Sequence, residues 1–279
     1  MTKRNLPKVD MNARPGVKSD FSQQALSRWN PDVKASVSNE GSISIIDPIG
    51  ENWYGDGVTA KRIAGALREI GNDDIVVNIN SPGGDFFEGL AIYNLLREHS
   101  GKVTVKVLGI AASAASVIAM AADEVQIARA SFLMIHNTWV CSCGDRHALR
   151  DVADWLEPFD NAAVDIYAAR TGLPSAELAT MCDRETWIGG AAAVEKGFAD
   201  ALLASDEVDS SLSNASLTEV GAQKKLDVAL ACGHSLPKSE RRKLYAALKG
   251  GTSRAAPSGT SSAAVETFAA LALTKLESL

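Results

Sequence analysis

The sequence predicts an α/β protein that combines a largely parallel sheet with one long helical segment. Short β-branched runs, such as 75–80 and 103–108, alternate with amphipathic segments that have helical spacing. Strands and helices that alternate at this length form βαβ units, in which the strands lie parallel. Only 6% of the 279 residues are aromatic while 46% are hydrophobic, so the core must be built mainly from Ala, Val, Ile and Leu.

The elements of the first half follow from periodicity and turn residues. Residues 59–70 repeat apolar side chains at i, i+3, i+4 and i+7, as an amphipathic helix does. Residues 75–80 form a β-branched run that ends at Ser-Pro-Gly-Gly, as a strand does. In chain order we expect strand 41–49, helix 59–70, strand 75–80, helix 86–98, strand 103–108, helix 110–122, and strands 124–128 and 132–135.

The second half begins with a long helix at 146–170, which carries an apolar stripe on one face and contains Pro158. Gly172 is expected to end this helix, because glycine readily adopts the left-handed conformation of a helix C-terminus. A last α–β segment at 187–202 completes the domain.

Composition divides the chain into three parts. Residues 1–40 have few large apolar side chains and predict a flexible N-terminal arm, whereas 41–204 form the domain. Residues 205–279 are rich in Ser, Ala, Thr, Lys and Glu, which predicts a low-complexity C-terminal extension. Short helices are expected there, and not expected to pack on the core, at 226–230, 244–248 and 268–276.

Charge, hydropathy and cysteine usage exclude several classes of function. A formal net charge of −6 argues against a nucleic-acid partner. The most apolar run, 103–122, contains Lys106 and suits a strand, turn and helix better than a membrane span. Cys141 and Cys143 form a C-x-C pair, not the C-x-x-C of common zinc or redox sites. We therefore expect a cytoplasmic protein with free thiols and with no metal, cofactor or membrane partner.

Three motifs could carry chemistry, although each also has a structural explanation as a plain turn, a tightly packed helix or a core histidine. The turn at 80–84 contains two glycines, whose amides can face a ligand. Ser113 lies where a strand gives way to a helix, next to unpaired N–H groups, whereas Ser116 is one turn further on and is expected to pack. His136 is the one histidine of four that emerges from a core strand, where a general base can be held rigidly.

A serine nucleophile needs a base, and the base needs an acid that orients it. Asp183 and Glu185 are the candidates, because both precede a strand-like Thr-Trp-Ile segment. An ordinary charged loop would explain them equally well.

In their order, these motifs resemble those of the Clp protease proteolytic subunit, a self-compartmentalising serine peptidase of the ClpP/crotonase fold. Residues 80–84 look like its glycine turn, 109–114 like its G-x-A-A-S segment, and 134–136 like its M-I-H. Residues 192–200 look like its E-A-x-x-x-G-L-V-D ending, so the resemblance extends over about 41–204.

The resemblance implies a serine endopeptidase that works through an acyl-enzyme. Ser113 would be the nucleophile, His136 the base, and the amides of Gly84 and Ala114 the oxyanion hole. Counting back from the motif around Gly197, the family's aspartate falls on Glu185, with Asp183 as the alternate acid. A Glu here departs from the family pattern, but Ser-His-Glu triads also work.

Two further departures resemble the ClpP-like head-maturation (prohead) proteases of tailed bacteriophages: the extension 205–279 and the Glu-Thr-Trp segment at 185–187. That branch implies polypeptide substrates, including phage capsid or scaffold proteins and the chain itself, and a location inside a procapsid. The wider family implies a homo-oligomeric ring, stacked through helix 146–170. It also implies a Clp-type ATPase partner for any ATP dependence, since the chain contains no phosphate-binding loop.

Two other functions are compatible with the same fold. A crotonase-type acyl-CoA enzyme needs an oxyanion hole and carboxylates but no serine–histidine pair. A non-catalytic scaffold or assembly protein needs only the fold and the extension.

Overall fold

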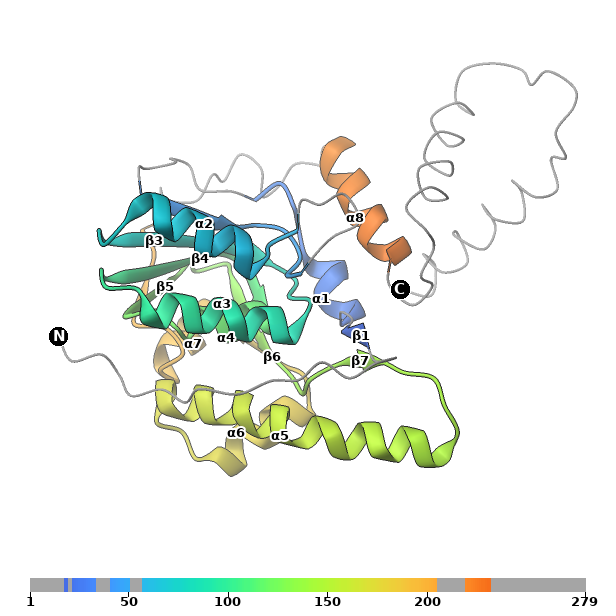
Figure 1. The fold of residues 1–279 in the computed structure, drawn as a ribbon. Coiled ribbons are helices and arrows are strands. Elements are labelled where there is room, and N and C mark those ends of the chain that lie inside the picture. Colours follow the sequence, from blue (N-terminus) through green and yellow to red (C-terminus); the bar gives the residue numbers. More distant parts are fainter. Residues whose placement is uncertain (1–17, 20–21, 34–40, 51–56, 205–218, 232–279) are drawn as a thin grey trace, which may run out of the picture. The chain divides into compact units, whose positions relative to one another are not determined.

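A computed structural model of the chain describes residues 18–19, 22–33, 41–50, 57–204 and 219–231 (Figure 1). The contacts divide the chain into two units, Met1–Gly233 and His234–Leu279. All described residues belong to the first unit. The helices predicted at 244–248 and 268–276 lie outside the described residues.

The described elements alternate between strand and helix through most of the first unit. The strands are β1 Lys18–Ser19, β2 Ser42–Ile45, β3 Ile75–Ser81, β4 Val103–Ala112, β5 Glu124–Ile127, β6 Phe132–Ile135, β7 Val140–Cys141, β8 Thr186–Gly189 and β9 Ala201–Leu202. The helices are α1 Gln23–Arg28, α2 Ala60–Ile70, α3 Phe86–Glu98, α4 Ala114–Ala119, α5 Arg146–Thr171, α6 Ser175–Asp183, α7 Gly190–Glu195 and α8 Glu219–Ala231.

The main sheet is largely parallel, as predicted. Its order is β2-β3-β4-β5-β9, and every pair along this path is parallel. The long strand β4 pairs with β5 through its first half and with β6 through its second half, and β6 continues to β8 as an antiparallel pair. The ends of β4 and β6 therefore lie side by side, and these are the ends that carry Ser113 and His136.

The prediction of a helix from 110 was wrong, because β4 continues to Ala112. Ile110, Ala111 and Ala112 pair with Phe132, Leu133 and Met134 of β6, which secures the strand conformation. The helix α4 then begins only after Ser113. Pairing with a distant strand outweighed the helical preference of this alanine-rich stretch.

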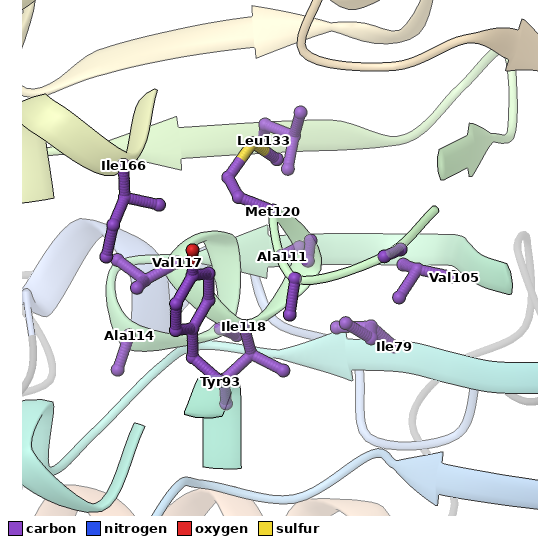
Figure 2. Packing of buried hydrophobic residues seen from close by; sticks show 14 of the residues in the cluster. Ile79, Tyr93, Val105, Ala111, Ala114, Val117, Ile118, Met120, Leu133 and Ile166 are labelled. Atoms are coloured by element: carbon purple, nitrogen blue, oxygen red, sulfur yellow. The ribbon is translucent and has the colours of Figure 1, made fainter. Parts of the chain in front are cut away.

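Small side chains let the helices approach each other closely in the core. Figure 2 shows Ala111, Ala114 and Val117 beside the larger side chains of Tyr93 and Ile118. A Cβ added at Gly89 of α3 would lie 2.9 Å from the Cβ of Ala114 in α4. The low aromatic content thus corresponds to a core in which alanine and glycine set the helix spacing.

The long helix α5 confirms the prediction at 146–170 and runs unbroken through Pro158. Asp145 caps its start, and Gly172 ends it in the left-handed conformation with φ 74°. None of the described helices is long and apolar enough to cross a membrane.

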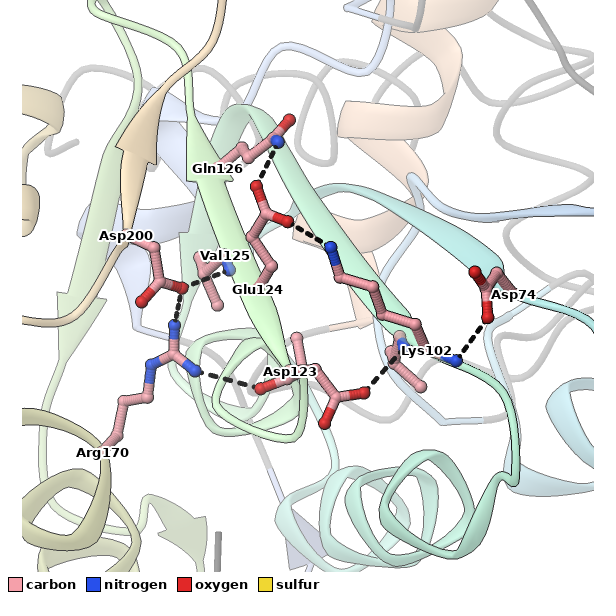
Figure 3. A network of polar contacts seen from close by, with 10 residues as sticks. Asp74, Lys102, Asp123, Glu124, Val125, Gln126, Arg170 and Asp200 are labelled. Carbon is pink, nitrogen blue, oxygen red and sulfur yellow. Dashed lines mark hydrogen bonds and ion pairs between the residues drawn. The ribbon is translucent and has the colours of Figure 1, made fainter. Parts of the chain in front are cut away.

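A network of charged side chains ties α5 to the sheet (Figure 3). The buried Arg170 donates to the Ala122 carbonyl at 3.0 Å and pairs with Asp200, which also accepts from the Val125 amide at 2.7 Å. Beside it, Asp123 accepts from the Val103 amide at 2.9 Å. The Arg170 contacts join the end of α5 to the segment before β5 and, through Asp200, to β5, while the Asp123 bond joins the residue before β5 to the start of β4.

Parts of both flanks belong to the packed structure. Within the predicted arm, α1 and Trp29 are buried against β4 and β6, and Trp29 is 0% exposed. The expectation that the helix at 226–230 stays off the core was wrong, because α8 buries Val228 in the same cluster. A few apolar residues supply the buried contacts, namely Ala25, Leu26 and Trp29 in the first segment and Val228 in α8, and average composition does not reveal them.

Candidate active site

Ser113 lies at the turn between β4 and α4 in a strained backbone conformation. Its φ is 55° and its ψ −124°, values that a residue with a side chain adopts at a cost. Its amide donates to the Met134 carbonyl at 2.9 Å, and its carbonyl accepts from the Ser116 hydroxyl at 2.6 Å. Strand β6 and helix α4 therefore fix the turn, and Ser116 has the packing role that we expected.

His136 follows β6 directly and faces Ser113. Its Nε2 lies 2.6 Å from the Ser113 Oγ, a hydrogen-bond distance. Burial lowers the pKa of His136, and the negative charge of Glu185 partly offsets this effect. The lowered pKa favours the neutral imidazole, which is the form that can accept a proton from a hydroxyl.

The structure brings Glu185, and not Asp183, to the second nitrogen of this histidine. The Glu185 Oε2 lies 4.0 Å from His136 Nδ1, which is an ion-pair distance rather than a hydrogen bond. Asp183 instead accepts a hydrogen bond from the Asn137 side chain at 2.8 Å. Glu185 has a left-handed backbone with φ 48°, which turns the chain between α6 and β8.

The glycine turn lies against the nucleophile. A Cβ added at Gly83, where φ is +91°, would meet the Ala112 carbonyl oxygen at 2.6 Å and the Ser113 Cβ at 2.7 Å. Only glycine allows this contact. Within the described part of the chain, the Gly84 and Ala114 amides donate no hydrogen bond to a protein acceptor. Both amides are available to a bound group.

Asn80 anchors the start of the same turn. Its side-chain oxygen accepts from the Ile110 amide at 3.2 Å, and its amide nitrogen donates to the carbonyls of Asn30 at 2.7 Å and Val33 at 3.1 Å. A Cβ at Gly109 would lie 2.5 Å from the Asn80 oxygen, so glycine is required there as well. Asn80 and Gly109, the first residues of the motifs at 80–84 and 109–114, therefore lie in contact.

Ser22 and Trp29 were not among the predicted site residues, yet both contact the site. The Ser22 hydroxyl donates to Glu185 Oε2 at 2.9 Å, and the Trp29 indole donates to the Asn80 carbonyl at 3.0 Å. The available signal was local: a serine before a short helical segment, followed by a tryptophan in an otherwise polar stretch.

Other candidate groups lie away from this site. His99 contacts the Asp73 carbonyl at 2.8 Å, and His147 lies near the start of α5. Cys141 and Cys143 are exposed and are not joined in a disulfide within the described residues, while burial raises the pKa of the Cys182 thiol to about 12. No group of three metal-ligating side chains occurs within the described ranges.

Comparison with known families decides the membership of this chain. The model of the Clp protease family matches residues 27–206, well over half of the sequence. The chain belongs to the Clp protease family. The match covers Ser113, His136 and Glu185, and it begins after Ser22.

Curated relatives in the Clp protease family are similar at low identity. A segment of 135 residues is 32% identical to "ATP-dependent Clp protease proteolytic subunit 3" of Rhodococcus jostii, and covers 47% of this chain and 66% of the relative. A segment of 213 residues is 28% identical to "ATP-dependent Clp protease proteolytic subunit 1" of Protochlamydia amoebophila, and covers 74% of this chain and 97% of the relative. The match to the first relative therefore spans just under two thirds of that protein's length.

Proposed function

We propose that the chain is a serine endopeptidase that uses Ser113, His136 and Glu185. The observation that carries this proposal is the 2.6 Å distance between Ser113 Oγ and His136 Nε2 at a strained strand-to-helix turn. Membership in the Clp protease family supports the same chemistry. A crotonase-type enzyme would not need such a pair.

The first half of the reaction forms an acyl-enzyme. His136 Nε2 takes the hydroxyl proton while Ser113 Oγ attacks the peptide carbonyl, which gives a tetrahedral oxyanion and an imidazolium. The imidazolium then gives its proton to the leaving amine as the C–N bond breaks. In the second half, His136 removes a proton from water, the hydroxide attacks the acyl group, and the proton returns to Ser113.

Two groups lower the energy of the charged species. The amides of Gly84 and Ala114 are proposed to donate to the oxyanion, which supplies roughly 3–4 kcal/mol per donor in comparable sites. The Glu185 carboxylate stabilises the imidazolium and fixes the orientation of the ring. Asp183 is the alternate acid, although it is engaged by Asn137.

Fluorophosphonate labelling combined with peptide hydrolysis tests this proposal. The wild-type protein should be labelled on the peptide that contains Ser113, and Ser113→Ala should lose both labelling and hydrolysis. Ser44→Ala is the matched control, because Ser44 is exposed on β2. Labelling that persists in Ser113→Ala would refute the nucleophile. A protein without labelling or hydrolysis would favour the scaffold function, and acyl-CoA turnover would favour the crotonase-type enzyme.

We further propose that the chain belongs to the phage head-maturation branch, and that its substrates include capsid or scaffold proteins and its own extension. Glu in place of the family's usual Asp, and residues 207–279 beyond the family match, support this assignment. Intact-mass measurements should show shortening of the wild-type protein but not of Ser113→Ala. Identical full-length masses would contradict self-cleavage.

We also propose that the chain assembles into a homo-oligomeric ring and acts in the cytoplasm or inside a procapsid. An ATPase partner is proposed as well. The names of the curated relatives describe those proteins as ATP-dependent. Any ATP dependence of this chain would come from a second protein.

A further inference from the structure

We propose that Ser22, which lies before the family match, is a positioning residue for the catalytic acid Glu185, and that α1 is therefore part of the active site. This inference rests on the proposed function. It starts from one contact: the Ser22 hydroxyl donates to Glu185 Oε2 at 2.9 Å. The same oxygen lies 4.0 Å from His136 Nδ1. Ser22 therefore holds the oxygen that faces the catalytic histidine.

The hydroxyl of Ser22 is itself fixed in place. Ser22 is 4% exposed, and its Oγ accepts from the Ala25 amide at 3.4 Å as the N-cap of α1. Because the oxygen accepts this bond, its proton is left to point at the carboxylate. A hydroxyl held by its own helix loses little entropy when it binds a second group.

Helix α1 is in turn anchored to the elements that carry the nucleophile and the base. Ala25, Leu26 and Trp29 pack against Ala112, the residue before Ser113, and Met134, two residues before His136. The guanidinium of Arg28 lies 4.2 Å from the ring centre of Trp187, which is two residues after Glu185. The segment of α1 and Trp29 thus contacts residues that lie within two positions of each of the three proposed catalytic residues.

Glu185 has few other restraints within the described part of the chain. Its Oε1 is buried without a hydrogen-bond partner there, and Ser22 is the one side chain that donates to its carboxylate. A glutamate also has one more rotatable bond than the aspartate usual in the family. A buried, partly unsatisfied carboxylate with this extra freedom needs an outside donor to stay aimed at the imidazole.

Ser22 is expected to act on His136 through the charge of Glu185. Glu185 is the charge that raises the pKa of His136 against the effect of burial. The nearby carboxylate of Asp183 is bonded to Asn137. If Ser22 is lost, the Glu185 carboxylate should spend less time near the imidazole, so the pKa of His136 should fall.

The first test compares full-length Ser22→Ala, Ser22→Thr and Ser27→Ala in peptide hydrolysis. Ser27 is the matched control, because it is an exposed serine of the same helix whose hydroxyl donates to the Gln24 carbonyl. Loss of one hydrogen bond to a charged group should lower kcat of Ser22→Ala about 10- to 100-fold with little change in KM. Ser22→Thr should retain most activity, and Ser27→Ala all of it. An unchanged or raised kcat in Ser22→Ala would overturn the proposal, a raised value indicating that Ser22 restrains the acid away from His136.

The second test does not need activity. NMR titration of the His136 ring, assigned with His136→Gln, should give a lower pKa in Ser22→Ala and a lower pKa still in Glu185→Gln. Adding Ser22→Ala to Glu185→Gln should have no further effect, because Ser22 acts only through the carboxylate. Equal pKa values in wild type and Ser22→Ala would overturn the positioning role. If the wild type neither labels nor hydrolyses, the proposed function fails, while this titration still decides the coupling.

Discussion

Burial lowers the pKa of His136 and the negative charge of Glu185 raises it, and burial is the larger effect. A buried imidazole resists protonation because the charged form loses its hydration. The charge of Glu185 acts the other way and favours the charged ring. In the proposed mechanism, the base would therefore be neutral at rest and Glu185 would stabilise its protonated form during the reaction.

The pH dependence of kcat/KM should follow from this balance. The active form of His136 is neutral, so activity should be lost as pH falls through the pKa of the free enzyme's base. Since that pKa lies below the ordinary value of 6.5, the acidic inflection should lie below pH 6.5. Initial rates on a fluorogenic peptide across pH 4.5–8.5, with ester substrates as a control for ionisation of the peptide, would measure it. An inflection above 6.5 would contradict the burial argument.

Replacing each of the two candidate acids, Glu185 and Asp183, should show by its effect on kcat which of them orients His136. Glu185→Gln removes the charge that supports the imidazolium, and should lower kcat by roughly 10²- to 10⁴-fold. The acidic inflection should also move to lower pH, because the pKa of His136 loses its upward contribution. Asp183→Asn is the matched control and should change kcat less than about threefold. The reverse order of effects would assign the acid to Asp183.

Gly83 should tolerate no side chain, for two separable reasons. Its φ of +91° strains any other residue, and a Cβ would overlap the Ala112 carbonyl and Ser113. Gly71→Ala is the matched control, because its φ is +80° but nothing lies within 4 Å of the added carbon. Chemical denaturation should show about 1 kcal/mol lost in Gly71→Ala and a larger loss in Gly83→Ala, with activity abolished only in the latter. Equal losses of unfolding free energy in the two variants would mean that the structure around Gly83 shifts without cost to accept the added Cβ.

At the residue scale, the structure brings the candidates Ser113, His136 and Glu185 together, and their catalytic roles stay predictions. Local pattern marked Ser113 and His136 because each follows a core strand, although it also allowed a structural explanation. Glu185 came from the resemblance, by counting back from the motif around Gly197. Ser22 was not predictable, because its bond to Glu185 joins residues 163 positions apart. The local sequence can indicate that Ser22 caps a helix, but it does not indicate the contact with Glu185.

At the element scale, α1 and α8 stabilise each other as well as the domain. Lys225 of α8 donates to the Ser27 carbonyl at the end of α1 at 2.7 Å, and Lys224 pairs with Asp47 at 2.8 Å. Val228 and Trp29 share one buried cluster. Loss of a buried Trp side chain costs roughly 3–5 kcal/mol, so α1 is held firmly even though it is short.

Truncation should distinguish α8 from the residues beyond it. A chain that ends at 233 keeps the whole first contact unit and should unfold at the same denaturant midpoint as the full chain. A chain that ends at 218 loses α8 and should be about 1–3 kcal/mol less stable, mainly through Val228. Lys224→Ala serves as a control, because its partly exposed ion pair should contribute less than about 1 kcal/mol. Equal midpoints for the two truncations would show that α8 contributes nothing.

The regular elements were predictable where periodicity was strong, as in α2, α3 and α5. The end of β4 was not, because its pairing with β6 is a long-range property that overrides an alanine-rich local pattern. The packing of α1 and α8 was missed for a related reason. One buried Trp or Val can anchor a helix whose surroundings are polar on average.

At the scale of the whole molecule, three large apolar side chains are exposed among the residues that the structure describes: Phe132 at 43%, Trp139 at 47% and Leu149 at 46%. Leu149 lies on α5, the helix through which the resemblance implies that rings stack. An association surface on α5 would have to bury apolar side chains of this kind.

Sedimentation should therefore detect species well above the 29.4 kDa monomer. Leu149→Glu places a charge in the proposed contact and should shift the distribution toward smaller species. Ser175→Glu adds the same charge at an exposed position of α6 and should leave the distribution unchanged. A monomeric wild-type protein would contradict the ring.

The position of α1 also determines how the protein should be cut for study. A fragment designed from the family match would start at residue 27, inside α1, and stop at 206, before α8. It would retain the proposed nucleophile, base and acid, yet lack Ser22, the proposed positioning residue, and α8, which contacts α1. Such a fragment could be soluble and still misreport the activity of the chain. Expression tags and cleavage sites should accordingly be placed before residue 18 and after residue 233.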